Sequence, residues 1–484
     1  MDVYTILISL LLFLNICLAM VVIFLERKDA SGTWAWLMVL LFIPLLGFLL
    51  YLIFGQNLSK NRMFQWEDRK KLGIEKRLAE QKRTFQTGAF DHRFSEIEDS
   101  HELIYMFLIN NDAILTNDNS VNIFTSGKDK FAALLQDISK AKNHIHLQYY
   151  IFKVDGIGKK LLQAVTEKAK QGVKVRILYD ELGSRGLRKK MFKELRAAGG
   201  EVEVFFPSKL HLINVHLNYR NHRKLAIIDG KIGYVGGFNV GDEYLGLKKK
   251  FGHWRDTHLR ITGEAVYSIQ TRFILDWNQA SEHHDIHYHE SYFPPLSPEL
   301  SGQTFMQIVT SGPDSEWEQI KYGYIKLISS AKKTVFIQTP YFIPDTSVLD
   351  ALRIASLSGI DIRIMIPNKP DHPFVYWATY SYIGELLKAG IKVYIYENGF
   401  IHAKMIIVDG KICSVGTANI DVRSFRLNFE VNAFMYDAAI AQQLTTTYYE
   451  DMSTSRELTS EQYTQRSLWI RFKESISRLL SPIL

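Results

Sequence analysis

Two stretches of this chain carry the same chemically active side chains at the same spacing. Each has a histidine, a lysine two residues later, an aspartate five residues after the lysine and an asparagine ten residues after the aspartate. The stretches are 221–239, with His222, Lys224, Asp229 and Asn239, and 401–419, with His402, Lys404, Asp409 and Asn419. Three fixed identities at fixed offsets arise by chance at roughly one position in ten thousand. Two copies with matching tails therefore predict a duplicated site.

These residue types together suit a phosphate group. An imidazole can attack phosphorus or move a proton near neutral pH, a lysine supplies positive charge, and an asparagine amide donates hydrogen bonds to phosphate oxygens. Alternate side chains of a strand share a face, so the histidine and lysine of each copy point the same way. Two facing half-sites would place an imidazole on each side of a phosphodiester, one as nucleophile and one as general acid. The sequence thus predicts a phosphodiester site with a mechanistic reason for its duplication.

Four carboxylates complete the candidate set. Asp229 and Asp409 are counted with the catalytic motif, although their opposite strand parity and their Asp-Gly turns favour a role in anchoring the turn. Asp256 in HWRDTHLRI and Glu430 in LNFEVNAFM occupy corresponding places downstream of the two motifs. A nucleophilic histidine needs a partner that fixes its tautomer, so we expect these two to hydrogen-bond to the histidines. For one isolated copy, a pair of surface residues at a strand end would be the simpler interpretation, and the doubling argues against it.

The sequence contains no Walker loop, no paired-aspartate metal motif and no HExxH helix, so we predict neither a metal nor a nucleotide cofactor. Positive charge at the site must then come from lysines and hydrogen-bond donors. The histidine-rich stretch HHDIHYHE at 283–290 is compatible with metal binding, but a solvated loop explains it equally well.

Composition indicates an acidic partner. The 484 residues carry a net charge of +7 and a pI of about 9.0, which suits nucleic acid, a phospholipid surface or a phosphorylated substrate. Only two cysteines occur, so a disulfide framework is excluded and a reducing, cytoplasmic setting is favoured.

The first 55 residues predict a membrane hairpin. Apolar runs at 4–25 and 33–54 are each about 22 residues long, or roughly 33 Å as helix, enough to span a hydrocarbon core. A cleaved signal peptide is the alternative for the first run, but it lacks a basic start and a clear cleavage site. Basic residues follow the second run closely, so we expect a multi-pass protein of the bacterial cell membrane with both ends and the catalytic domain on the cytoplasmic side. Residues 56–110 are expected to form a juxtamembrane linker.

Beyond about residue 110 the chain repeats itself. Three pairs of segments indicate a helix end leading into a strand: AKNHIHLQYYIF and AKKTVFIQTPYFI, GVKVRILYD and GIDIRIMIP, and LRAAGGEVEVF and LLKAGIKVYIY. Apolar strands alternating with helices predict an α/β fold with mixed sheets covered by helices. We expect a first repeat at 111–290, a second at 291–450 and an amphipathic C-terminal segment at 451–484. That last segment suits either docking on a membrane surface or packing on the protein's own core.

The repeated HxKxxxxD, followed by GGxN or GTxN, resembles the motif of the phospholipase D superfamily over roughly residues 110–450. With the N-terminal hairpin and the segments NYRNHRKLAIIDG, HWRDTHLRI, QTPYFIPD and DVRSFRLNFEVN, the whole chain is similar to the bacterial cardiolipin synthases. The resemblance implies two phospholipase D-like α-β-α repeats. It also implies transfer of a phosphatidyl group from one phosphatidylglycerol to another, giving cardiolipin and glycerol through a phosphohistidine.

Carried onto this chain, the resemblance makes His222 the nucleophile and His402 the acid that protonates the departing glycerol and then deprotonates the acceptor hydroxyl. It assigns phosphate binding to Lys224, Lys404, Asn239, Asn419 and Thr417. Gly237 stands where Thr417 carries a hydroxyl, so the first half-site is expected to have one donor fewer. The expected partners are phosphatidylglycerol, cardiolipin and an anionic membrane surface, without a cofactor and without nucleic acid.

Three other functions are compatible with the motif. A hydrolytic phospholipase D would use water as the acceptor, and a membrane-tethered phosphodiesterase or nuclease would cleave a different backbone. The chain shows no aromatic-interleaved strand platform or recognition helix, which argues against the nuclease. A non-enzymatic lipid-binding scaffold would not need both histidine-lysine pairs. Acyl-chain preference, alternative acceptor alcohols and oligomeric state are left open.

Overall fold

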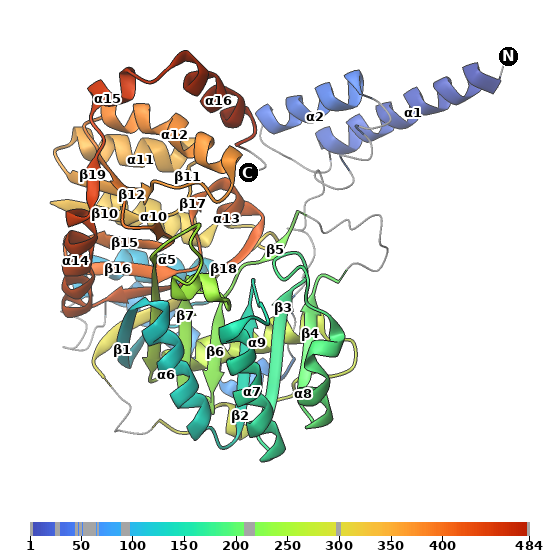
Figure 1. Ribbon diagram of the computed structural model, residues 1–484, viewed down its shortest axis with the longest axis vertical. Coiled ribbons are helices and arrows are strands. Elements are labelled where there is room, and N and C mark those ends of the chain that lie inside the picture. The colour runs from blue at the N-terminus through green and yellow to red at the C-terminus, as the bar shows by residue number, and fades with distance from the viewer. Residues whose placement is uncertain are drawn as a thin grey trace.

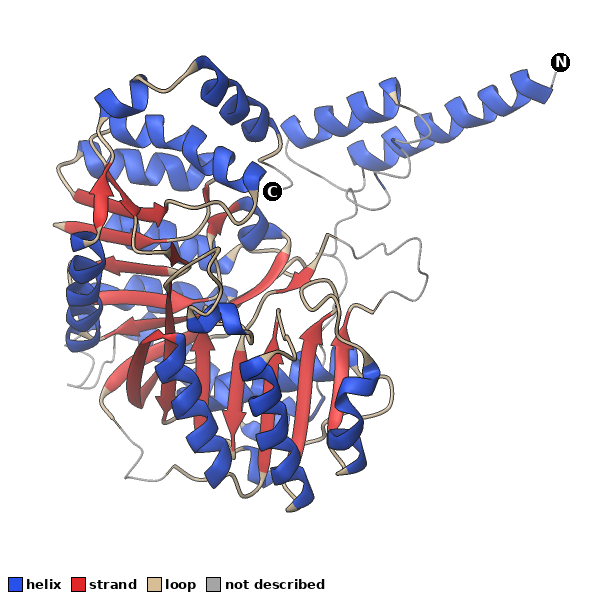
Figure 2. Cartoon of the chain, in the orientation of Figure 1, coloured by secondary structure: helices blue, strands red, loops and turns tan. Residues whose placement is uncertain are grey.

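The computed structural model describes residues 3–24, 30–43, 47, 51, 64, 67–88, 97–207, 218–296 and 302–481. Figures 1 and 2 show two sheets, each flanked by helices, in the two halves of the chain. The predicted α/β class with mixed sheets and a repeated unit is confirmed.

The first sheet has the strand order β4-β3-β2-β6-β7-β8-β1. Strands β2, β3 and β4 are parallel, and the remaining neighbours are antiparallel, which makes the sheet mixed. The bounds are β1 Thr116–Ser126, β2 His144–Tyr149, β3 Lys174–Asp180, β4 Glu201–Phe205, β6 Leu225–Ile228, β7 Ile232–Gly236 and β8 Trp254–Thr262.

The second sheet repeats this order as β13-β12-β10-β15-β16-β18-β9, with β19 added outside β13. Strand β1 pairs with both β8 and β9 and so joins the two sheets. The bounds are β9 Thr304–Ser311, β10 Thr334–Gln338, β12 Asp361–Pro367, β13 Lys392–Tyr396, β15 Met405–Val408, β16 Ile412–Gly416, β18 Asn428–Tyr436 and β19 Ser455–Glu457.

Helices cover both faces of each sheet. In the first half they are α6 Gly127–Lys140, α7 Gly156–Lys170, α8 Lys193–Ala197 and α9 Ala265–Ala280, with short 3-10 turns η4 Lys189–Phe192, η5 Asp242–Leu245 and η6 Glu290–Tyr292. In the second half they are α10 Gln319–Ser330, α11 Thr346–Leu357, α12 Pro373–Lys388, α13 Val422–Arg426 and α14 Ala438–Ser453. Two short helices, α15 Ser460–Thr464 and α16 Leu468–Leu479, follow β19.

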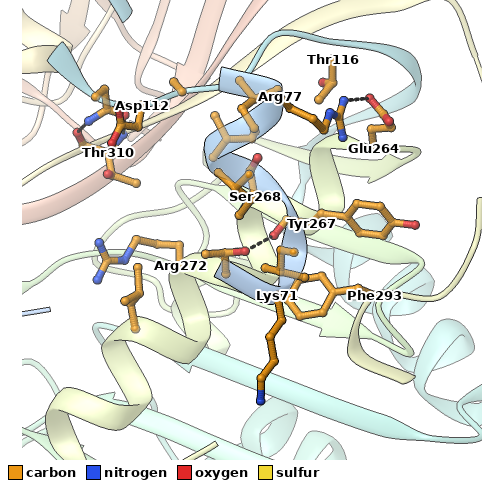
Figure 3. A pocket seen from close by; sticks show the side chains of 18 of the residues that line it. Lys71, Arg77, Asp112, Thr116, Glu264, Tyr267, Ser268, Arg272, Phe293 and Thr310 are labelled. Atoms are coloured by element: carbon orange, nitrogen blue, oxygen red, sulfur yellow. Dashed lines mark hydrogen bonds and ion pairs between the residues drawn. The ribbon is translucent and has the colours of Figure 1, made fainter. Parts of the chain in front are cut away.

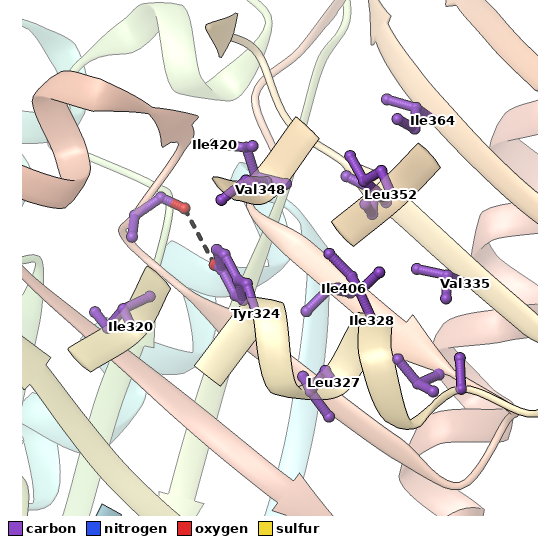
Figure 4. Close-up of a cluster of buried hydrophobic side chains, with 14 of the residues drawn as sticks. Ile320, Tyr324, Leu327, Ile328, Val335, Val348, Leu352, Ile364, Ile406 and Ile420 are labelled. Atoms are coloured by element: carbon purple, nitrogen blue, oxygen red, sulfur yellow. Dashed lines mark hydrogen bonds between the residues drawn. The ribbon is translucent and has the colours of Figure 1, made fainter. Parts of the chain in front are cut away.

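The sequence pattern of the strands explains this layering. In β12 the side chains of Ile362, Ile364 and Ile366 join one buried cluster, whereas Met365 between them joins another. Successive strand residues point to opposite faces, so a strand whose apolar side chains join two different clusters has a core on each side. Figure 4 shows one such core, to which Tyr324 and Leu327 of α10, Leu352 of α11 and Val335 of β10 all contribute.

Two short strands tie each half to the other near the motifs. Strand β5, Arg220–Asn221, runs parallel to β18 of the second sheet, and β14, Phe400–Ile401, runs parallel to β8 of the first. These pairings close the strand network on itself. A further parallel pair links β11 Phe342–Ile343 to β17 Ile420–Asp421.

Part of the segment predicted as a linker belongs to the core. After η2 Glu67–Leu72 and α4 Ile74–Thr87, helix α5 His101–Asn110 buries Ile104 and Phe107 in the second-half cluster. The Phe107 ring lies 4.6 Å from that of Phe434. Residues 101–110 are therefore part of the folded unit, because their apolar spacing gives α5 a face that packs on the sheet. The other predicted domain boundaries stay predictions.

The N-terminal region contains α1 Val3–Phe24 and α2 Ala30–Phe42. Within the described parts of the chain, no helix is both long and apolar enough to cross a membrane. The predicted membrane hairpin is thus not confirmed, and much of the second run, 33–54, lies outside the described residues.

Candidate active site

Each motif histidine is hydrogen-bonded by a carboxylate from the other half of the chain. His222 Nδ1 lies 2.9 and 3.0 Å from the two carboxylate oxygens of Glu430. His402 Nδ1 lies 2.6 Å from Asp256 Oδ2. An ionised carboxylate only accepts hydrogen bonds, so each Nδ1 carries the proton and each neutral ring keeps a lone pair on Nε2. Each carboxylate thus bonds to the histidine of the other half, and its effect on catalysis stays a prediction.

The backbone explains this exchange. Asn221 pairs with Phe429 in the β5–β18 ladder, and the next N–H, that of His222, donates to the Phe429 carbonyl at 3.0 Å. In the same way Ile401 pairs with Arg255, and the His402 N–H donates to the Arg255 carbonyl at 2.7 Å. Each histidine therefore sits one residue beyond a short strand that is added to the opposite sheet.

Each motif lysine donates a hydrogen bond to the backbone of its own motif. Lys224 Nζ donates to the His222 carbonyl at 2.5 Å, and Lys404 Nζ donates to the His402 carbonyl at 2.6 Å. Lys404 Nζ is also 2.9 Å from His402 Nδ1, but that nitrogen already donates to Asp256, so we interpret this as a close contact rather than a hydrogen bond. Both ammonium groups are almost completely buried.

Burial dominates the electrostatics of the site. Removal from water lowers the pKa of His222 and of His402 to about 4, so both imidazoles are neutral at pH 7. Burial likewise lowers the pKa of Lys224 to about 7 and that of Lys404 to about 8. Burial alone would raise the pKa of Glu430, but the nearby His222 and Lys224 lower it overall.

The two half-sites form one electrostatic unit. The charge of Lys404 lowers the pKa of His222, and the charge of Lys224 lowers that of His402, beyond the larger effect of burial. Each lysine is therefore close enough to the histidine of the other half to affect its titration. The arrangement brings two neutral imidazoles and two buried amino groups together, as expected for a site that receives a phosphodiester.

Asp229 and Asp409 have a different environment. Asp229 accepts hydrogen bonds from the backbone N–H groups of residues 142, 143 and 144 at 2.7 to 3.0 Å. Asp409 does the same for residues 332, 333 and 334 at 2.7 to 2.8 Å. Both have positive φ, 55° and 54°, at the Asp-Gly turn. This geometry supports the turn-anchoring role and not a direct catalytic one, because each carboxylate is saturated by the start of the neighbouring strand.

The predicted phosphate-binding amides are buried beside the motifs. Asn239 Oδ1 accepts from the Ile151 N–H at 3.0 Å, and its Nδ2 donates to the Tyr244 hydroxyl at 3.3 Å, which leaves one amide hydrogen. The Asn419 N–H donates to the Ser424 hydroxyl at 3.2 Å, and burial raises the pKa of Asp421, two residues on, to about 6. Phosphate binding by both asparagines stays a prediction.

Thr417 and Gly237 differ for a steric reason. A Cβ atom at residue 237 would lie 1.9 Å from Asp256 Oδ1, so only glycine leaves room for this short carboxylate. Thr417 Oγ1 accepts from the Val431 N–H at 2.9 Å and donates to the Val431 carbonyl at 3.2 Å. Its hydroxyl is thus committed to β18, which does not support the prediction that it donates to a phosphate oxygen.

A buried layer that we did not predict supports the histidines. Gln148 and Gln338, at matching places in the repeats, donate to Asp276 and Asp451 at 2.6 and 2.8 Å. Asp276 binds Arg223, which follows His222 and donates from Nε to the Glu430 carbonyl at 3.1 Å. Asp451 binds Arg255, which precedes Asp256. The matched glutamines in HLQYY and FIQTP were the feature of the sequence from which this layer could have been predicted.

The linker reaches this layer through Phe64. Its ring lies 5.3 Å from that of Phe429 and 4.2 Å from the guanidinium carbon of Arg272. Phe64, Arg223 and Arg272 line a cavity of about 300 Å³. Arg272 also borders a second cavity of about 350 Å³ between α4 and α9, where Figure 3 shows Arg77 paired with Glu264. The motif histidines and lysines, all described, lie outside both linings.

The histidine-rich stretch makes ordinary polar contacts. His284 Nδ1 lies 3.1 Å from Glu203, and His289 accepts from the Ser291 N–H at 3.2 Å. Within the described ranges, no group of three or more His, Cys, Asp or Glu side chains could hold a metal ion.

Comparison with known proteins places these features in a family. The model described as "Cardiolipin synthase, PLD-like domain" matches residues 134–274 and 324–452, and the "Phospholipase_D-nuclease N-terminal" model matches residues 13–56. The major cardiolipin synthase ClsA of Bacillus subtilis is 68% identical over 100% of both chains. A cardiolipin synthase of Listeria monocytogenes is 57% identical over 99% of each. A phosphatidylserine synthase structure from Haemophilus influenzae, at 13% identity, shares the fold with a TM-score of 0.59 over 75% of this chain and 95% of that one. The chain belongs to the cardiolipin synthase family of phospholipase D-like proteins.

Proposed function

We propose that this chain is a phosphatidyltransferase that converts two phosphatidylglycerol molecules into cardiolipin and glycerol. The observation that carries the proposal is the exchanged pair of imidazoles, each neutral and each held through Nδ1 by a carboxylate of the other half. The names of the full-length relatives support the same reaction.

In the first step, the Nε2 lone pair of His222 attacks phosphorus. A P–N bond forms, the P–O bond to the headgroup glycerol breaks, and His402 gives its Nε2 proton to the departing oxygen. This requires His402 to be protonated at that moment. The negative charge of the bound phosphodiester raises the pKa of a nearby imidazole, which offsets the burial that lowers it in the empty site.

In the second step, a glycerol hydroxyl of another phosphatidylglycerol takes the place of the departed glycerol. His402, now neutral, accepts the hydroxyl proton while the oxygen attacks phosphorus and the P–N bond breaks. Cardiolipin leaves, and both histidines return to their starting states. Lys224 and Lys404 stabilise charge on the phosphate oxygens, so the chain's own residues suffice for each transfer.

The substrate suggests where the protein works. We infer that the N-terminal region, matched at 13–56 by the family model, anchors the chain as a helical hairpin in the bacterial cell membrane. The basic residues after it, among them Lys70 and Lys71, favour a cytoplasmic catalytic domain on an anionic leaflet.

The test is purified full-length protein with phosphatidylglycerol as the only lipid. Cardiolipin and glycerol in equal amounts support the proposal, and phosphatidic acid in place of cardiolipin would show a hydrolase. Enzyme denatured in detergent at neutral pH, which spares the acid-labile P–N bond, should carry the phosphatidyl group on His222. The His222→Ala variant should show neither label nor product, and a label on His402 would reverse the two roles.

A further inference from the structure

Helix α16 buries a polar face and exposes an apolar one, which is the reverse of an ordinary surface helix. Its apolar side chains face solvent, with exposed fractions of 80% for Leu468, 63% for Trp469, 54% for Phe472, 41% for Ile476 and 76% for Leu479. The side that packs on the protein buries Glu474 and Ser477 instead. A surface helix normally places its apolar stripe against the core. We call the five exposed residues the α16 apolar face.

Polar contacts hold the helix in this orientation. Glu474, 3% exposed, binds Arg466 Nε at 2.8 Å. Arg478 pairs with Glu385 of α12. The Ser467 hydroxyl accepts from the Ile470 N–H at 3.3 Å and caps the first turn. Rotating α16 to bury its apolar face would break the Arg478–Glu385 pair and separate Glu474 from Arg466, so the outward apolar face is a built feature of the fold.

Basic side chains flank the α16 apolar face. At 100° per residue, Arg471 and Arg478 lie along one border of the face and Lys473 lies along the other. Figure 1 shows α16 at the same end of the molecule's long axis as α1 and α2. Those helices also expose apolar side chains, including Phe13 and Phe42.

We propose that the α16 apolar face inserts into the surface of an anionic phospholipid bilayer. An interfacial helix combines an apolar face of Leu, Trp and Phe with basic residues at its borders, and this is the composition of α16. Packing on the protein's own core is excluded by the outward orientation. A second copy of the chain is a poor occupant, because it would bring the same basic borders together. The proposal does not depend on the transfer reaction, since it concerns membrane contact alone.

The experiment reads the environment of Trp469 in the full-length protein. The protein is reconstituted into vesicles of phosphatidylglycerol and phosphatidylcholine, with or without bromine on the acyl chains. The Trp469 contribution is the difference between wild-type and Trp469→Phe fluorescence. Brominated lipid should quench most of this contribution, and aqueous acrylamide should quench little of it.

Matched variants make the result specific. Phe472→Ser/Leu479→Ser should lose most of the bromolipid quenching, whereas the control Gln465→Ala/Ser475→Ala on exposed polar positions should keep it. Phe472→Leu/Leu479→Phe should restore it, which separates lost lipid contact from misfolding. Quenching of Trp469 by acrylamide alone would show a face that stays in water. Protection from both quenchers would show a face covered by protein, and either result would overturn the proposal.

Discussion

The two half-sites share a spacing but differ in how their histidines are supported. Around His222, the motif supplies Arg223, and the facing strand supplies Phe429. Around His402, the motif has Ala403 at the arginine position, and the facing strand supplies Arg255 instead. Asp276 thus binds an arginine next to the motif histidine of its own half, whereas Asp451 binds an arginine that comes from the other half. The two halves have therefore diverged together, and neither histidine is correctly placed without the other half.

The same complementarity governs the carboxylates. The shorter one, Asp256, occupies space that a Cβ at Gly237 would fill, whereas the longer Glu430 coexists with Thr417 at the equivalent place. Each carboxylate is therefore matched to the residue at position 237 or 417 of its own half, so a threonine at position 237 would clash with Asp256.

Replacing each carboxylate with its amide should reduce activity more than any other change to the residues that support the two histidines. Glu430→Gln and Asp256→Asn place an amide NH2 donor beside Nδ1, which favours the wrong tautomer, and activity should fall by about 10² to 10⁴-fold. The two variants should differ with a phosphatidyl substrate whose leaving group is p-nitrophenol, which needs little protonation. With this substrate, Asp256→Asn should release nitrophenolate at a rate close to that of the wild type, because it impairs only the proposed acid. Glu430→Gln should stay slow, because it impairs the proposed nucleophile. Equal recovery in both would contradict the division of roles between the histidines.

The two half-sites should also differ in how much their arginines contribute to the free energy of unfolding. Arg255→Met leaves Asp451 buried without its arginine and should lower the free energy of unfolding by about 3 to 5 kcal/mol. Arg223→Met should cost less, because Arg272 Nη2 also lies 2.6 Å from Asp276. Urea unfolding in detergent, followed by near-ultraviolet circular dichroism, measures both values.

The control for the arginine variants removes the uncompensated charge. Arg255→Met/Asp451→Asn should regain most of the stability lost by Arg255→Met. If the double variant is no more stable than the single one, the loss comes from packing around the arginine and not from the unpaired carboxylate.

Spacing predicted most of the site but not its assembly. The repeated histidines and lysines and the matched Asp256 and Glu430 were recognisable because duplication preserves offsets along the chain. The exchange of partners was not, because β5 and β14 are two residues long and carry no periodic pattern. Periodicity likewise indicated that α16 is amphipathic but not which face is buried, since that depends on the ion pairs of Glu474 with Arg466 and of Arg478 with Glu385.

The two lysines should give kcat/KM a pH dependence in which the contribution of each half-site can be distinguished. A lysine binds phosphate only when protonated, so kcat/KM for phosphatidylglycerol should fall as pH rises through the free-enzyme pKa values of about 7 for Lys224 and about 8 for Lys404. The charge of Lys404 lowers the pKa of Lys224, in addition to burial. In Lys404→Met the remaining decline should therefore shift to higher pH. A decline that stays in place would show that another group controls it.

Phe64 offers the mildest perturbation, because it touches only the first half-site. Its ring packs on Phe429, whose carbonyl accepts the His222 N–H, so Phe64→Ala loosens the backbone that positions one histidine and not the other. An aromatic pair contributes about 0.5 to 1.5 kcal/mol, which corresponds to about 2- to 10-fold in kcat if it is lost in the transition state.

We expect KM to stay constant and the Phe64→Tyr variant to retain kcat. The control variant Phe85→Ala, on the same linker against His101, should leave kcat unchanged. If the phosphohistidine forms on His222, as we propose, the rate of enzyme labelling should fall by the same factor as kcat. A fall in kcat without slower labelling would place the contribution of Phe64 in the second transfer and weaken the link between the linker and the first half-site.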